Sequence, residues 1–413
     1  MTDKSSSHSE SLGQIKAGVN SPLMNGVIAI IPARGGSKGI KDKNLQHVGG
    51  TPLLARTIIA LQGSSAISSV YVSTDSIAIA KLARLYGAQV VMRPSNLSDD
   101  AASSESAILH AIESIRDSGT DPTSVVFAQC TSPFIEPSDV DGIIDLLNTF
   151  DSALTVTDNH SFIWRQSSEG SATGINHEPT VRLPRQMLPK EFKETGALYA
   201  FNVAGFEKSK HRFFGRIGMY PIPTERSMEI DEPYDLVLAN QLAKSFSKVA
   251  GMPKLTKFKS VVFDFDGVLT DNVVSVDSNG LETVSCSRSD GMGIQMLKDA
   301  GYSLLILSKE RNAVVTARGK KLDVEVIQGC DNKLQRLIQW LADKKLLAEE
   351  CIYIGNDIND RECMEFVGMA LAPADAHPSI NTATIWKLHA NGGAGAAREL
   401  ADLLLHSQAS PLS

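Results

Sequence analysis

The chain has 413 residues, of which 42% are hydrophobic and 21% charged, and its net charge at pH 7 is −7. This length predicts roughly two or three domains, and the composition is ordinary for a globular protein with a large core. The acidic balance argues against nucleic acid as a main partner, because proteins that bind nucleic acid are usually basic. No run of about 18 apolar residues occurs, so the sequence predicts no membrane span.

The N-terminal segment and the cysteines give information on the cellular compartment of the protein. Residues 1–24 are rich in serine and lack the apolar centre of a secretory signal, so we expect a disordered tail. The five cysteines form no CxxC pair. Dispersed cysteines in a large acidic protein are typical of reduced thiols, so the sequence predicts a cytoplasmic protein without a disulfide or zinc framework.

The first half of the chain alternates short β-branched runs with helical patterns. Strands are predicted at residues 27–31, 69–75, 88–93 and 124–134, and helices at residues 52–62, 76–87 and 103–119. Gly87 and Gly119 are expected to end two of these helices. The alternation predicts an α/β domain with a mostly parallel sheet, covered by helices on both faces, whose ligands bind beyond the carboxyl ends of the strands.

A break in this rhythm predicts a domain boundary. The segment "SFSKVAGMPKLTKFKS" brings glycine, proline and lysines together, and a second alternating set of strands and helices follows it. We expect the chain to divide as follows: a first domain at residues 25–246, a linker at 247–257, a second α/β domain at 258–406 and a frayed tail at 407–413.

The loop after the first strand, "ARGGSKGIKDKN", places glycines among cations. Glycine lets backbone N–H groups approach phosphate oxygens closely. Arg34 can bind a phosphate through two parallel hydrogen bonds, and Lys38 adds a compact positive charge. The spacing matches neither a Walker A loop nor GxGxxG. From its residues alone, the loop is therefore either a phosphate-binding loop or a solvated basic turn.

Several stretches in chain order carry a family resemblance: "IPARGGSKGIKDKN", "VSTDS", "VMRPSNLSDDAASS", "QCTSP", "LPRQ", "GALYAFN" and "SMEIDEPYD". As a set, over roughly residues 26–245, they resemble the N-acylneuraminate cytidylyltransferases. The resemblance implies a Rossmann-like nucleotidyltransferase fold and the transfer of CMP from CTP to the anomeric hydroxyl of a nine-carbon acidic sugar, with Mg²⁺. Related acids (legionaminic, pseudaminic and 3-deoxy-manno-octulosonic acid) stay open as substrates.

The same resemblance assigns roles to individual residues. Matches to the triphosphate-binding loop are Arg34, Ser37, Lys38 and Asn44; matches around the cytosine are Arg93, Ala102 and Ser104; the match to a sugar-contacting glutamine is Gln129. An essential arginine is implied in "VRLPRQ", where Arg182 and Arg185 are equal candidates. The alternatives without a role in substrate binding are a surface arginine at position 93 and a basic surface loop at 182–185.

Acidic residues near position 230 are candidate Mg²⁺ ligands. The ion prefers oxygen and keeps several waters, so one or two carboxylates together with phosphates are enough. Asp231 is the preferred ligand. The family has aspartate where this chain has Glu229, which leaves an inner-sphere role for that residue open. Asp235 is expected to cap the following helix, because an acid suits a helix N-terminus.

In the second set of elements, "VVFDFDGVLTDN" places Asp264 and Asp266 two residues apart after an apolar strand. A carboxylate nucleophile with a neighbouring acid suits hydrolysis of a phosphomonoester. The stretch resembles the haloacid-dehalogenase (HAD) phosphatases, in particular those acting on 3-deoxy-manno-octulosonate 8-phosphate, over roughly residues 258–405. The resemblance implies that Ser308 and Lys333 bind phosphate.

One position departs from the phosphatase pattern. In "YIGNDIND" the branch usually has aspartate where this chain has Asn356, so either Asn356 or the following Asp357 would complete the Mg²⁺ site. Two interpretations of the domain stay open: an active phosphatase acting on a nine-carbon sugar 9-phosphate, or a scaffold that sets the oligomeric state. The transferase relatives form dimers and the phosphatase relatives tetramers, which implies a homodimer or homotetramer.

Overall fold

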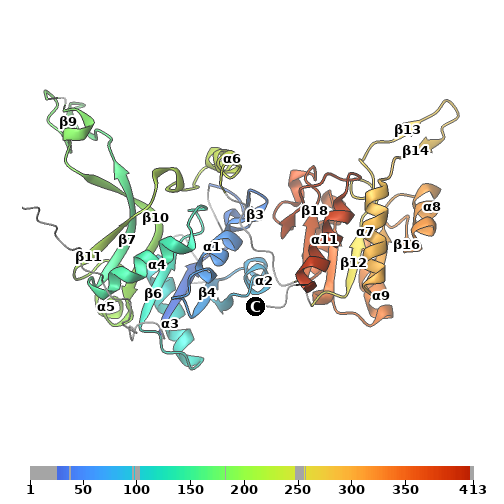
Figure 1. The fold of residues 1–413 in the computed structure, drawn as a ribbon, viewed down its shortest axis with the longest axis horizontal. Coiled ribbons are helices and arrows are strands. Elements are labelled where there is room, and N and C mark those ends of the chain that lie inside the picture. The colour runs from blue at the N-terminus through green and yellow to red at the C-terminus, as the bar shows by residue number, and fades with distance from the viewer. Residues whose placement is uncertain are drawn as a thin grey trace, which may run out of the picture.

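In the computed structural model, the described residues are 26–36, 39–94, 97, 103–181, 183–246, 255 and 257–409, without the side chains of residues 185 and 406–409. The predicted N-terminal tail, most of the predicted linker and the last residues of the predicted C-terminal tail lie outside these ranges. Figure 1 shows the described chain as two α/β lobes, each built around its own sheet. No helix among these residues is both long enough and apolar enough to cross a membrane.

The first lobe is built on a sheet to which the described residues contribute seven strands, in the order β11-β7-β10-β6-β1-β4-β5. Their bounds are β1 Val27–Pro32, β4 Ser69–Thr74, β5 Gln89–Met92, β6 Ser124–Ala128, β7 Ser152–Asn159, β10 Glu191–Asn202 and β11 Ile217–Pro221. Strands β1, β4, β5 and β6 are parallel, as predicted, whereas β10 runs antiparallel to both of its neighbours. The sheet is therefore mostly parallel, with one reversed strand inside it.

Helices cover both faces of this sheet, and the side chains of β1 show why. Ile28 and Ile30 pack with α3 and α5 on one face, whereas Val27, Ala29 and Ile31 pack with α1, α2 and α4 on the other. A central parallel strand is buried on both sides, so its sequence is apolar throughout rather than alternating. The bounds are α1 Leu53–Gln62, α2 Ile77–Leu85, α3 Ser104–Asp117, α4 Pro137–Asp145, α5 Val203–Ser209 and α6 Pro233–Leu242.

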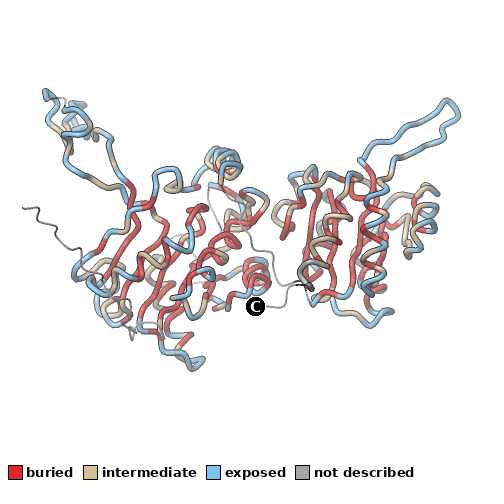
Figure 2. Tube along the Cα trace, in the orientation of Figure 1, coloured by how far each residue is buried: buried red, intermediate tan, exposed pale blue. Residues whose placement is uncertain are grey.

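An arm projects from the first lobe where β7 and β10 continue beyond the sheet (Figure 1). At its end, β8 (Trp164–Gln166) pairs with β9 (Ala172–Gly174), and both strands are largely exposed. Figure 2 shows the contrast between this exposed arm and the buried strands of the sheet. The sequence analysis did not predict the arm.

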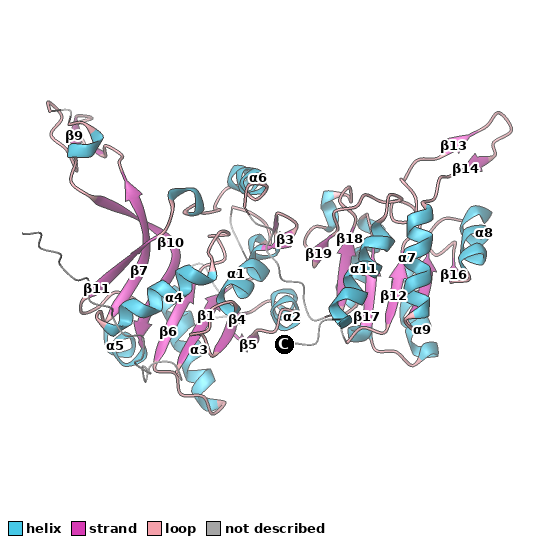
Figure 3. Ribbon diagram, viewed as in Figure 1, coloured by secondary structure: helices cyan, strands magenta, loops and turns pink. Residues whose placement is uncertain are grey.

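The second lobe contains a sheet in the order β16-β15-β12-β17-β18-β19, in which every pair is parallel. Its strands are β12 Ser260–Phe263, β15 Ser303–Leu307, β16 Glu325–Ile327, β17 Cys351–Ile354, β18 Met369–Ala372 and β19 Trp386–Lys387. Its helices are α7 Arg288–Asp299, α8 Ala313–Leu322, α9 Lys333–Lys344, α10 Arg361–Phe366 and α11 Ala396–Ala409. An exposed hairpin, β13 (Ser275–Val276) with β14 (Glu282–Thr283), projects from this lobe in Figure 3. The predicted α/β class is confirmed in both lobes.

Candidate active sites

The loop after β1 lies beside the end of β4, at the carboxyl edge of the first sheet. The Gly35 amide donates a hydrogen bond to Asp75 Oδ1 at 2.9 Å. A Cβ at position 35 would lie only 3.1 Å from the Ser76 Cβ, so the glycine permits this close approach. Asn44 Nδ2 donates to the Arg34 carbonyl at 3.1 Å and holds the loop across its base. Two predicted phosphate-binding residues, Ser37 and Lys38, lie outside the described residues.

Arg93 is 9% exposed, so the alternative of a surface arginine is wrong. Its Nη2 donates to the Ser73 carbonyl at 2.8 Å and its Nη1 to the Leu97 carbonyl at 3.2 Å. Burial lowers the pKa of Arg93, the Asp75 carboxylate opposes this shift, and the nearby charge of Arg34 adds to it. Two arginines near one sheet edge suit a polyanionic ligand, because a bound anion stabilises both charges. Ser104 is the first residue of α3, and Ala102 lies outside the described residues.

The segment after β6 meets the segment before α6 around a glycine. Gly196 has φ +70°, and a Cβ there would lie 3.0 Å from Glu229 Oε1 and 3.3 Å from Gln129 Oε1. A side chain at position 196 would thus take up the space beside the side-chain oxygens of both predicted site residues. Thr131 Oγ1 donates to Glu229 Oε1 at 3.2 Å. The structure therefore brings Gln129 and Glu229 together, although they are far apart in the sequence.

The basic loop and the acidic segment join at Asp231. Lys43 Nζ donates to Asp231 Oδ1 and to the Ile230 carbonyl, each at 3.0 Å. A Cβ at Gly39 would lie 2.5 Å from the Asp231 carbonyl oxygen, so only glycine allows this contact. Lys43 belongs to the basic loop, yet the sequence analysis assigned it no partner. Nothing in the local sequence could pair two residues that are 188 positions apart.

The acidic pair has the donor chemistry that Mg²⁺ requires. Burial, and then the charge of Asp231, raises the pKa of Glu229. Such repulsion between two carboxylates is relieved by a cation, and hard carboxylate oxygens suit Mg²⁺. Asp235, in contrast, accepts hydrogen bonds from the amides of Asp231 and Glu232 at 3.0 and 2.8 Å. It caps α6, as predicted.

The arginines at 182 and 185 lie between β9 and β10 in the chain. Arg182 lies outside the described residues, and only the backbone of Arg185 is described, at the start of a short 3₁₀ helix ending at Met187. Their role in binding the sugar carboxylate stays a prediction. The sequence gives no way to choose between them.

Charged side chains of the second lobe meet just after the carboxyl end of β12. Lys333 Nζ lies 2.7 Å from both Asp264 Oδ1 and Asp360 Oδ1, and all three side chains are buried. Burial, and then the Asp360 carboxylate, raises the pKa of Asp264, whereas Lys333 opposes the shift. Burial alone would lower the pKa of Lys333, but the two carboxylates outweigh it and raise it. The raised pKa of Asp264 reflects the cost of holding two carboxylates close together in a buried site, and a bound cation would lower that cost.

Asp360 is a site residue that the sequence analysis left unassigned. Its carboxylate also accepts hydrogen bonds from the Tyr353 hydroxyl at 2.8 Å and from the backbone N–H of Asn356 at 2.9 Å. It therefore holds Lys333 and the turn after β17 in one arrangement. The signal was present, since Asp360 ends the motif "YIGNDIND" that was already singled out.

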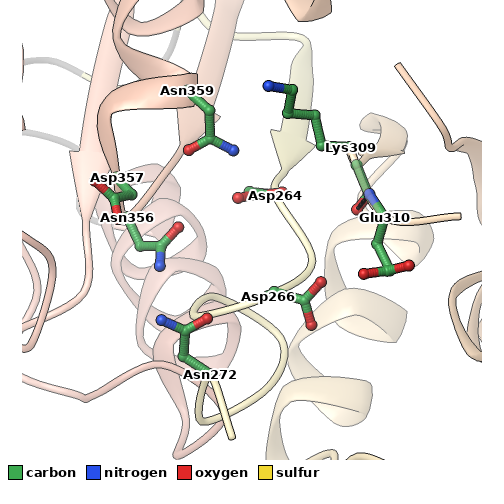
Figure 4. A pocket seen from close by; sticks show the side chains of 9 residues that line it. Asp264, Asp266, Asn272, Lys309, Glu310, Asn356, Asp357 and Asn359 are labelled. Atoms are coloured by element: carbon green, nitrogen blue, oxygen red, sulfur yellow. Dashed lines mark hydrogen bonds between the residues drawn. The ribbon is translucent and has the colours of Figure 1, made fainter. Parts of the chain in front are cut away.

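A pocket of about 270 Å³ opens onto this cluster (Figure 4). Its lining comprises Asp264, Asp266, Asn272, Ser308, Lys309, Glu310, Asn356, Asp357 and Asn359. Burial raises the pKa of Asp266, and a protonated carboxyl group is what a general acid needs. Five predicted residues therefore line one pocket: Asp264, Asp266, Ser308, Asn356 and Asp357. Lys333 is not in the lining and is joined to it through the ion pair with Asp264.

The structure distinguishes Asn356 from Asp357. Asn356 is 8% exposed, and a Cβ on Gly267 would lie only 1.9 Å from Asn356 Nδ2, so the side chain packs directly over the loop after Asp266. Asp357 Oδ1 instead accepts a hydrogen bond from the Ile358 amide at 2.6 Å and caps the next turn. Asn356 is thus the better placed of the two to complete an oxygen ligand set with Asp264 and Asp266.

The described residues contain no group of three or more His, Cys, Asp or Glu side chains placed to hold a metal ion. Mg²⁺ does not require such a group, because it commonly takes one or two carboxylates, with phosphates and waters completing the shell. The donor sets at Glu229–Asp231 and at Asp264–Asp266–Asn356 both fit that pattern.

Comparison with known proteins agrees with both lobes. A cytidylyltransferase family model matches residues 28–171. N-acylneuraminate cytidylyltransferase A of Danio rerio is 30% identical over 386 residues, which is 92% of this chain and 88% of that protein. N-acylneuraminate cytidylyltransferase of Oncorhynchus mykiss is 30% identical over 388 residues, which is again 92% of this chain and 88% of that protein. In a shorter match, 3-deoxy-D-manno-octulosonate 8-phosphate phosphatase of Salmonella typhi is 34% identical over 158 residues, 38% of this chain and 84% of that protein. The chain therefore belongs to the N-acylneuraminate cytidylyltransferase family.

Proposed function

We propose that the first lobe transfers CMP from CTP to the anomeric hydroxyl of N-acylneuraminate. The observation that carries this proposal is the junction of Lys43 with Asp231, where a cationic loop meets a carboxylate pair at the carboxyl edge of the sheet. Transfer of a nucleotidyl group needs neutralised charge and aligned reactants more than covalent catalysis. The arginine and lysine of the loop can bind the phosphates of a metal-bound triphosphate, and the two carboxylates can bind its metal ion.

In this mechanism the anomeric oxygen forms a bond to the α-phosphorus of CTP, and the bond from that phosphorus to the bridging oxygen breaks. Pyrophosphate leaves with the electron pair, and the hydroxyl proton passes to solvent. Arg34 and Lys43 balance the charge that grows on the leaving group. Bound Mg²⁺ would be held by Asp231 and Glu229 and would supply further charge neutralisation. Gln129, beside Glu229, would contact the sugar.

A panel of acidic sugars tests the activity and the substrate together. Purified protein with CTP and Mg²⁺ should release pyrophosphate fastest with N-acetylneuraminate. Legionaminic, pseudaminic and 3-deoxy-manno-octulosonic acids should react more slowly, and CTP without sugar should give no sustained release. A preference for one of the other acids would keep the reaction and change the substrate. No release with any of them would contradict the proposal.

We also propose that the second lobe is an active phosphatase for a nine-carbon sugar 9-phosphate. The specific observation in favour is the intact Asp264–Lys333–Asp360 cluster beneath an open pocket. Asp264 would attack the phosphorus and displace the sugar oxygen, which takes a proton from Asp266. Water, with its proton passing to Asp266, would then hydrolyse the aspartyl phosphate. Bound Mg²⁺ would neutralise charge on the phosphate.

A further inference from the structure

The two lobes touch at the segment that continues the basic loop. The Lys387 amide of β19 lies 3.5 Å from the Gly50 carbonyl, in the turn between β2 (His47–Val48) and β3 (Thr51–Pro52). The side chains of Leu45 and Val48 from the first lobe share one hydrophobic cluster with Ile385 of the second. An edge strand of one domain thus lies against a hairpin of the other, and the contact includes apolar side chains from both.

This hairpin is fastened to both halves of the nucleotide site. On the basic side, it follows Lys43 directly, and the Gln46 side chain donates a hydrogen bond to the Lys41 carbonyl at 3.0 Å. On the acidic side, Asn240 of α6 donates to the His47 carbonyl at 3.0 Å and accepts from the Gly49 amide at 3.1 Å. Helix α6 begins two residues after Asp231. A shift of the hairpin would therefore move the cations and the carboxylates relative to each other.

His47 marks how closely the contact is packed. Both of its ring nitrogens are buried. Burial, and then the neighbouring Lys387, lowers the pKa of His47 to about 4, whereas a backbone interaction with Ile385 of the second domain opposes the shift. Arg56 of α1, whose Nη1 donates to the Val48 carbonyl of the same hairpin, is also a cation and offers no acceptor to a protonated imidazole. The contact therefore requires a neutral imidazole and would be weakened by its protonation.

We propose that β19 of the second domain is a positioning element of the CTP site in the first domain. By holding the Leu45–Pro52 segment, β19 fixes the distance between the basic loop and Asp231. Without this contact the segment would lose its apolar partner in the second domain, and ordering the segment on CTP binding would cost conformational entropy. The second domain pre-orders the segment, so that CTP does not have to. This inference rests on the proposed function of the first lobe.

The test compares two buried substitutions in the full-length protein. Ile385→Ala removes an apolar side chain from the contact, whereas Leu341→Ala removes one from a separate cluster of the second domain that does not reach the first. Ile385→Ala should raise the KM for CTP by about five-fold or more, the lower range of coupling between sites, with kcat nearly unchanged. Leu341→Ala should leave the KM unchanged.

Each outcome of this comparison has a defined meaning. An unchanged KM in Ile385→Ala overturns the inference, and so does an equal rise in both variants, because it would reflect general destabilisation. If wild-type protein shows no CTP-dependent release of pyrophosphate, the proposed function fails instead, so the two failures are distinguishable.

A second variant keeps the inference testable if Ile385→Ala does not fold. His47→Asn removes the titratable ring but keeps the backbone carbonyl that Asn240 contacts. The pKa of His47 is lowered in the packed contact, so the contact is fully favoured above about pH 6.5 and weakens as the pH falls toward 4. The KM for CTP should therefore rise more steeply below pH 6.5 in wild type than in His47→Asn. Parallel profiles would overturn the inference, since the titration of CTP is common to both.

Discussion

At the scale of single residues, two neighbouring positions in the phosphatase motif have different tasks. Asn356 packs over the loop after Asp266, whereas Asp357 caps the following turn. Local sequence could not separate them, because both side chains offer oxygen and they are adjacent. The Asp360 carboxylate accepts hydrogen bonds from the backbone amides of both residues, so the difference lies in their side chains: Asn356 packs against Gly267, whereas Asp357 accepts from the Ile358 amide.

This difference predicts unequal effects of substitution. Asn356→Ala should reduce release of phosphate from a sugar phosphate by about ten-fold or more, as loss of a group that orients a metal commonly does. Asp357→Ala should cost much less, because it removes mainly a cap. Steady-state rates over a range of Mg²⁺ concentrations would show the difference, and direct titration with Mn²⁺ observed by electron paramagnetic resonance gives a readout independent of turnover. A larger loss in Asp357→Ala would reverse the assignment.

At the scale of elements, the parallel strands were predictable and the reversed one was not. Apolar β-branched runs and the glycines after α2 and α3 located the first elements, and both Gly87 and Gly119 do adopt positive φ. Strand β10 is harder to predict from the sequence. Its first half is polar and lies on the arm, whereas its second half is buried, and its register shifts between Glu194 and Tyr199. Its antiparallel direction depends on packing between β6 and β7 rather than on its own sequence.

The approach of the basic loop to the acidic segment also belongs to this scale. Gly39→Ala should abolish most CMP transfer, because the new Cβ would lie 2.5 Å from the Asp231 carbonyl oxygen and would force the two segments apart. No atom of the described residues lies within 4 Å of a Cβ at position 36, so Gly36→Ala, in the same loop, should cost clearly less activity. Rates of CTP-dependent pyrophosphate release measure both. Equal losses would mean that the loop tolerates no Cβ for a reason other than contact with Asp231.

At the scale of the whole molecule, the chain joins two sites on two sheets. Each site forms where strands end, as parallel α/β sheets require. The sequence predicts a site in each lobe, because each motif directly follows its strand. It could not show that Lys43 meets Asp231 or that β19 meets the hairpin at Gly50, because these contacts depend on the packing of distant segments. The predicted homodimer or homotetramer stays a prediction that light scattering can check.

Two separate sites should be separable by substitution. Asp264→Asn should eliminate phosphate release from a sugar phosphate, because an amide is no nucleophile, and should leave CMP transfer intact. Both activities can be assayed in one preparation, with wild type as the reference. Phosphate release that persists in the variant would come from another source. Loss of both activities would mean that the substitution disturbs the contact between the lobes.

The central claim is that the basic loop and the acidic segment together hold a metal-bound triphosphate. Isothermal titration calorimetry of purified protein with CTP and Mg²⁺ tests it most directly, with Arg34→Ala and Asp231→Ala as comparisons and circular dichroism to verify their folding. We expect saturable binding to wild type and a loss of about ten-fold or more in affinity in each folded variant, since a charged hydrogen bond contributes about 1.5–3 kcal/mol. Wild-type protein that gives no binding heat at any temperature tried, or variants that bind CTP as tightly as wild type, would contradict the claim.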